Sequence, residues 1–172
     1  MKNWTVLSVA SVTLRVLIVL NWLGGAAILA LLLATIIAEQ WTFTALGIAP
    51  SSAIPSMIMG LRAIAVLGLV AVPLNDVVLR RLRAIVETVR SGDPFVATNA
   101  DRLQAIAWAL LALQLLSLVI GGIGRAISTP AYPLHLGAGF STSGWLAVLL
   151  IFVLARVFAA GTQMREDLDG TV

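Results

Sequence analysis

Few residues of this chain belong to the types that enzymes use for chemistry. The sequence has no cysteine and a single histidine, His135, which excludes thiolate nucleophiles, disulfides and cysteine metal sites. A catalytic triad needs a nucleophile, a base and an orienting acid in one place. The stretches around Glu39 and His135 offer serines and an acid, but no spacing selects among them. We therefore expect an ordinary loop histidine and a protein that is not an enzyme.

Two other patterns could hold a cofactor or a metal, and neither has the neighbours it needs. The run 121–125 (GGIGR) is rich in glycine but lacks the Lys-Ser/Thr pair of a phosphate-binding loop. The one group of carboxylates, Glu166, Asp167 and Asp169, lies in a short polar tail. A metal site requires several converging ligands, so a solvated acidic tail is the simpler interpretation. We expect no metal and no cofactor.

Arg156 is the most unusual charged residue, because it lies slightly past the middle of an apolar run at 144–160. A guanidinium at that depth costs at least about 2.5–3.5 kcal/mol, so it should face other helices and find an acceptor. Asp76 is the nearest acid in expected depth, with Asn21 and Gln114 as polar neighbours. We predict an intramembrane ion pair between Arg156 and Asp76, which either sets the helix register or forms part of an ion path.

Membrane-spanning helices must position these residues. The chain is 60% apolar and 11% charged, with a mean hydropathy of +1.02, whereas soluble domains carry roughly 25% charged residues. A helix needs about 17–25 apolar residues to cross a bilayer. We predict an all-α polytopic membrane protein with one domain, 1–172. Its four-helix transmembrane bundle should have spans at about 16–38, 56–79, 102–124 and 144–160.

The first apolar run has two alternative interpretations. It is uncharged from residue 16 to residue 38 and begins directly after Arg15. The apolar core of a cleaved signal peptide is about 7–15 residues long, so a true span is favoured. Alanines recur every fourth residue within this run. They either allow another helix to approach closely or reflect the abundance of alanine in membrane helices. These alanines are Ala26, Ala30, Ala34 and Ala38.

A polar island separates the second and third runs. Apolar residues recur at helical spacing over 78–89, and Gly92 followed by Pro94 should stop the helix. The stretch 98–101 (TNAD) then resembles a capping box with aspartate in place of glutamate. We predict a cytoplasmic helical hairpin over about 76–102. Pro73, just before it, should bend the second span or free a carbonyl.

The distribution of basic residues predicts the orientation. The loops at 39–55 and 126–143 contain no lysine or arginine, whereas the N-terminus, the hairpin and the tail do. Cytoplasmic segments carry the excess of Lys and Arg. Both termini and the hairpin are therefore expected in the cytoplasm.

The stretches 81–108 and 153–172 resemble a bacterial family known as domain of unknown function 2975. Its members are small four-helix membrane proteins with a G-x-P-F…N-x-x-R-L hairpin and an F-x-x-G-x-x-L-R-E-E-x-E-x-T-V tail. Met164 and Gly170 depart mildly from that tail. The positions that match are Gly92, Pro94, Phe95, Asn99, Arg102, Leu103, Phe158, Gly161, Arg165, Glu166, Asp169, Thr171 and Val172.

The resemblance implies little biochemistry. Genes of this family commonly lie beside a gene for a small helix-turn-helix regulator, which implies a cytoplasmic DNA-binding partner and no direct nucleic-acid binding by this chain. We expect a non-enzymatic sensor or tether in the bacterial cytoplasmic membrane. The alternative is a small oligomeric transport or channel component. The bilayer and a second copy of the chain are further expected partners. The candidate surface for a partner or lipid headgroups comprises Arg80, Arg81, Arg83, Arg90, Gly92, Pro94, Phe95, Arg165, Glu166 and Asp169.

Overall fold

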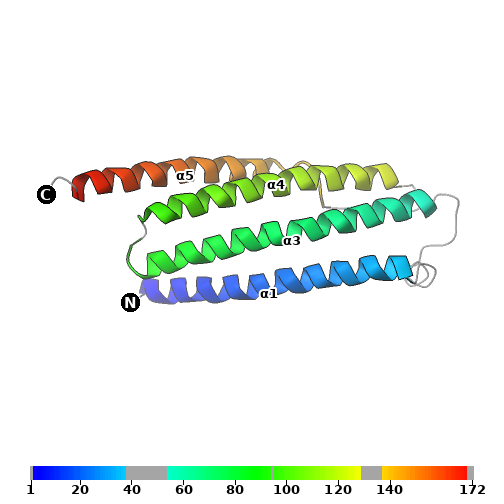
Figure 1. The fold of residues 1–172 in the computed structure, drawn as a ribbon, viewed down its shortest axis with the longest axis horizontal. Helices are drawn as coiled ribbons and strands as arrows, with labels where there is room; N and C mark the ends of the chain where they lie inside the picture. Colours follow the sequence, from blue (N-terminus) through cyan, green and yellow to red (C-terminus); the bar gives the residue numbers. More distant parts are fainter. Residues whose placement is uncertain (1, 38–53, 94, 129–136, 170–172) are drawn as a thin grey trace.

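The computed structural model describes residues 2–37, 54–93, 95–128 and 137–169, which form four long helices (Figure 1). They are α1 (Lys2–Ile37), α3 (Ile54–Arg90), α4 (Ala97–Ile127) and α5 (Thr142–Asp169). All four are long and apolar enough to cross a membrane. The prediction of an all-α chain with four such helices is confirmed. One difference is that α1 begins at Lys2, so this helix starts well before the first predicted span at about 16–38.

The helices pack as an open row in chain order (Figure 1). Within the described residues, α1 contacts only α3, α3 contacts α1 and α4, and α4 contacts α3 and α5. The expected bundle therefore does not close around a central core. Lipid tails are as apolar as leucine, so no hydrophobic driving force closes such a row, and close packing with one or two neighbours suffices for each helix.

A single seam joins α1 to α3. A Cβ on Gly25 would lie 2.9 Å from the side chain of Val72, which makes Gly25 a point of close approach. In the alanine stripe, Ala26 and Ala30 are exposed and Ala34 is half-buried, while Ala38 lies outside the described residues. The close approach at this point of the seam is made by Gly25. Among residues 6–37 of α1, whose side chains are described, the buried ones are Ser11, Leu14, Gly25 and Thr35.

Gly92 ends α3 as the sequence predicts. Its φ of +89° is the left-handed conformation that only glycine adopts without strain. The Gly92 amide donates to the Val89 carbonyl at 3.2 Å, and the Asp93 amide donates to the Thr88 carbonyl at 3.1 Å. These two bonds form a Schellman motif, which satisfies carbonyls at the helix end. The hairpin is not a separate element, since α3 continues across Pro73 to Arg90 as one helix.

The predicted capping box is wrong. Val96 precedes α4 and makes no side-chain capping bond, so Thr98 and Asp101 lie within the helix. Asn99, the residue between them, is 0% exposed and turns toward α3. The local pattern placed Asn99 at the start of a helix, but tertiary packing buries its side chain against α3.

Candidate functional site

Contacts between neighbouring helices fix the register of the arginines. Asn99 of α4 bonds to Thr88 of α3, and at the other end a Cβ on Gly60 would meet Ile127. Arg102 is therefore level with the last turns of α3, and Arg125 with Arg62. From Arg102 to Arg125 is 23 residues, about 34 Å along a helix. This matches the roughly 30 Å of bilayer hydrocarbon.

The arginines consequently form two layers. The smaller layer lies at the end away from the α3–α4 turn and contains Arg62 and Arg125. Arg62 donates to the Thr35 carbonyl of α1. The larger layer, which we call the hairpin-side layer, lies toward the α3–α4 turn. Its members on α1 and α5 are placed by contacts described below. The hairpin-side layer comprises Arg15, Arg80, Arg81, Arg83, Arg102 and Arg156.

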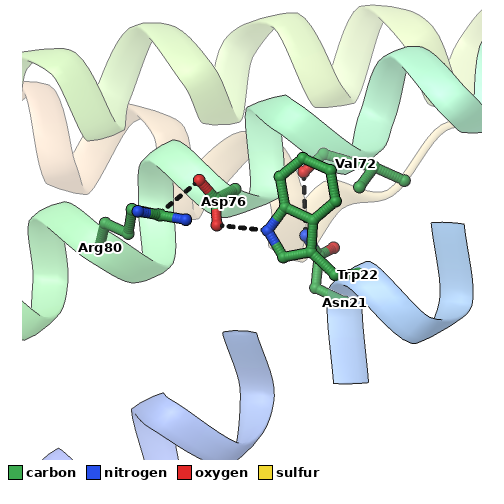
Figure 2. Close-up of polar contacts among 5 residues, drawn as sticks. All are labelled: Asn21, Trp22, Val72, Asp76 and Arg80. Carbon is green, nitrogen blue, oxygen red and sulfur yellow. Dashed lines mark hydrogen bonds and ion pairs between the residues drawn. The ribbon is translucent and has the colours of Figure 1, made fainter. Parts of the chain in front are cut away.

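A polar cluster joins α1 to α3 and extends inward from Arg80 of the hairpin-side layer (Figure 2). The Asn21 amide donates to the Val72 carbonyl at 3.0 Å, and Trp22 Nε1 donates to Asp76 Oδ1 at 3.0 Å. Arg80 Nε lies 2.6 Å from Asp76 Oδ2, one helical turn along α3. Both carboxylate oxygens of Asp76 are therefore engaged, and the polar side chains of Asn21 and Trp22 are both satisfied by groups of α3. Arg15, seven residues before Trp22, is level with the arginines of α3.

Arg156 does not pair with Asp76, which corrects the sequence prediction. Arg156 is exposed, and α5 makes no contact with α3 in the described part of the chain. Its depth was also misjudged. The Trp108–Phe152 and Phe95–Phe158 ring contacts bracket Arg156 along α5 and place it level with Arg102. Because α5 extends to Asp169, Arg156 belongs to the hairpin-side layer and not to the middle of the bilayer.

Replacing Trp22 by phenylalanine should loosen α1. The substitution keeps an aromatic ring and removes only the indole donor to Asp76, so we expect a loss of about 0.6–1.7 kcal/mol, the range for interhelical hydrogen bonds in membranes. Trp108→Phe is the matched control, because the indole of Trp108 has no hydrogen bond among the described residues. Unfolding free energies in mixed detergent and SDS measure both. Equal losses would contradict a stabilising role for the Trp22–Asp76 bond.

The α3–α4 turn and α5 meet through aromatic packing. The Phe95 and Phe158 rings stack with centroids 5.4 Å apart, and a Cβ on Gly161 would touch the Phe95 ring at 3.8 Å. The two stretches that resemble the family are thus brought together. We call the residues at this end the hairpin–tail surface: Arg80, Arg81, Arg83, Arg90, Gly92, Phe95, Phe158 and Gly161.

The other candidate residues are distributed as follows. Arg80, Arg81, Arg90, Gly92 and Phe95 are exposed, and Arg83 is half-buried. The ion pair between Arg90 and Glu87 is loose, at 3.9 Å. Pro94 lies outside the described residues. Arg165, Glu166 and Asp169 lie on the last turns of α5, where the side chains are outside the described part.

Sequence reasoning missed the polar bridge between α3 and α4. The Asn99 amide donates to Thr88 Oγ1 at 2.7 Å, while Asn99 Oδ1 accepts from Arg102 at 2.8 Å. Asn21 and Trp22 did carry a signal, since both interrupt an apolar run, and Trp22 is too deep for an interfacial aromatic belt.

The part of the chain that the structure describes contains no cluster of metal ligands. Among the described residues, no three His, Asp or Glu side chains gather as metal ligands. His135 and Glu39 lie outside those residues. The arginines of this site can bind anions. Together with the stacked rings of Phe95 and Phe158, they can also present a shaped surface.

Comparisons with known proteins identify a family without a known activity. A family model described as "Protein of unknown function (DUF2975)" matches residues 65–172, more than half of the chain. No curated protein and no solved structure matches the chain.

Proposed function

We propose, from the premise that this chain belongs to the DUF2975 family of unknown function, that it is a non-enzymatic membrane sensor or tether. Its partner would be a cytoplasmic protein, such as a small helix-turn-helix regulator. The membrane would be the bacterial cytoplasmic membrane. The hairpin–tail surface is the proposed contact, and the helices anchor it at the bilayer.

The observation that carries the proposal is the stacking of Phe95 on Phe158. It joins residues 63 positions apart in the chain, and each ring belongs to one of the two family-like stretches. Phe95 remains 51% exposed although it packs on α5. An exposed aromatic ring at a polar, arginine-rich end is typical of a residue that anchors a protein partner.

The orientation follows from charge. Nine of the eleven basic residues lie toward the hairpin side, and only Arg62 and Arg125 lie toward the other side. The positive-inside rule supports a cytoplasmic location for the hairpin, both termini and the partner. The length of α3 allows this end to extend out of the bilayer, because 37 residues span about 55 Å, well beyond the hydrocarbon.

Transport is the weaker candidate. A transporter normally shows ionisable residues in series or broken helices near mid-membrane. Asp76 is the one carboxylate between the two arginine layers in the described residues, and Trp22 and Arg80 already engage it. We therefore retain the tether as the proposed function.

Phe95→Ala is expected to reduce co-purification of the neighbouring helix-turn-helix regulator. Loss of an aromatic anchor commonly costs more than 1 kcal/mol, or about fivefold in affinity. The experiment extracts the epitope-tagged protein in mild detergent and quantifies the regulator that is retained. Deletion of residues 165–172 should also reduce recovery, because it removes the candidate contact residues Arg165, Glu166 and Asp169. All four helices keep their apolar spans in this variant.

The matched control is Phe140→Ala, which removes an exposed ring at the opposite end of the molecule. It should leave recovery of the regulator unchanged. If wild type, Phe95→Ala and the truncated chain all recover the regulator equally, or none recovers it, the tether proposal is wrong.

A further inference from the structure

The Trp108–Phe152 contact brings two polar side chains to one surface. The rings meet edge to face, with centroids 5.3 Å apart, across the seam between α4 and α5. Because α4 and α5 are antiparallel, the residue one turn before Trp108 and the residue one turn after Phe152 lie toward the same end of the molecule. The residues there are Gln104 and Arg156, both exposed. Helical spacing thus places Gln104 on the Trp108 face of α4 and Arg156 on the Phe152 face of α5, both toward the hairpin-side layer.

Arg156 has a charge without an internal partner. The part of the chain that the structure describes offers it no ion pair or hydrogen bond, unlike Arg102, which donates to Asn99. Its position is level with the arginines at the boundary of the apolar zone. A guanidinium at such a boundary is costly unless it reaches an anion or the headgroup region.

The surface beside Arg156 continues as an apolar stripe into the span. On α4, Leu115 and Val119 follow Trp108 at intervals of seven and four residues, so they share its face. Leu149 precedes Phe152 by three residues on α5. All of these except Phe152 are exposed, and Phe152 is half-buried. From Gln104 to Val119 is 15 residues, about 22 Å, close to the length of an extended acyl chain.

We propose that this α4–α5 seam binds an anionic phospholipid of the hairpin-side leaflet. The guanidinium of Arg156 binds the phosphate, and the Gln104 amide donates a second hydrogen bond. One acyl chain lies along Trp108, Leu115 and Val119. A soluble anion would use the polar end only, whereas the length and apolar character of the stripe fit a lipid. The site is distinct from the hairpin–tail surface and does not depend on the proposed partner.

Native mass spectrometry of the detergent-purified protein tests the site. Wild type is loaded with equal amounts of dioleoylphosphatidylglycerol and dioleoylphosphatidylcholine, and retained lipid is counted for each. We expect the anionic lipid to be preferred and Arg156→Gln to weaken its retention about fivefold, the change that corresponds to roughly 1 kcal/mol per basic side chain. Gln104→Leu, which leaves the arginine in place, should weaken it less.

The matched control is Arg15→Gln, which removes another exposed arginine of the same layer, on α1, a helix that contacts neither α4 nor α5 among the described residues. It should leave retention of the anionic lipid unchanged. Equal losses in Arg156→Gln and Arg15→Gln would mean a diffuse charge effect, and unchanged retention in Arg156→Gln would mean no site there. Displacement of the lipid by excess inorganic phosphate would identify a soluble anion as the ligand. Any of these three results overturns the proposal.

Discussion

Replacing Gly121 by alanine is expected to destabilise the protein by about 1–3 kcal/mol, the cost of inserting a methyl group into a tightly packed site. A Cβ on Gly121 would lie 2.5 Å from the carbonyl oxygen of Ala138 and 2.8 Å from the Cα of Gly139. These are backbone atoms, which cannot rotate away as a side chain does. Ser117 also holds this backbone, since its hydroxyl bonds to both the amide and the carbonyl of Gly139, at 3.1 and 3.3 Å.

The matched control is the neighbouring glycine. A Cβ on Gly122 would meet nothing within 4 Å, so Gly122→Ala should be neutral or stabilise the helix by up to about 1 kcal/mol. Thermal unfolding in detergent measures both variants. Gly121→Ala should lower the unfolding temperature, whereas Gly122→Ala should leave it unchanged or raise it. A Gly121→Ala protein as stable as the Gly122→Ala protein would show that the segment before α5 does not pack on α4 as described.

Replacing Asn99 by alanine is expected to cost about 1–3 kcal/mol, the penalty for breaking buried hydrogen bonds. The side chain is fully buried and links Thr88 of α3 to Arg102 of α4. Thr88 keeps its own bond to the Ile85 carbonyl at 2.7 Å, whereas Arg102 loses an acceptor. The separation of α3 from α4 near the hairpin should therefore become easier. Hydrogen exchange of the hairpin amides, together with unfolding free energies, measures this effect.

Thr98→Ala distinguishes the buried bridge from a helix cap. If Thr98 capped α4, its loss would cost about 1 kcal/mol. Because α4 already begins at Ala97 and Thr98 is exposed, we expect a change below about 0.5 kcal/mol. If Thr98→Ala lowered the free energy of unfolding as much as Asn99→Ala does, Thr98 would be a cap of α4 and the stabilising role of the Asn99 bridge would be contradicted.

The sequence by itself determined the features that depend on one segment at a time. Four apolar runs predicted four membrane-spanning helices, because the length of an apolar stretch is sufficient to specify a span. Gly92 predicted the end of α3, since the left-handed conformation at that position is a local requirement. Short motifs also revealed the resemblance to the family, whose model matches residues 65–172.

Only the tertiary structure decided the features that depend on which helices meet. Arg156 appeared deep when counted within its own span, but the ring contacts with α4 and Phe95 place it at the hairpin-side layer. Asp76 was expected to pair across the protein, yet it bonds to Trp22 and to Arg80 on its own helix. Asn99 looked like part of a cap and proved to be an interhelical bridge. The physical reason is that apolar periodicity specifies a helix but not its neighbours, since lipid-facing and helix-facing surfaces are equally apolar in a membrane.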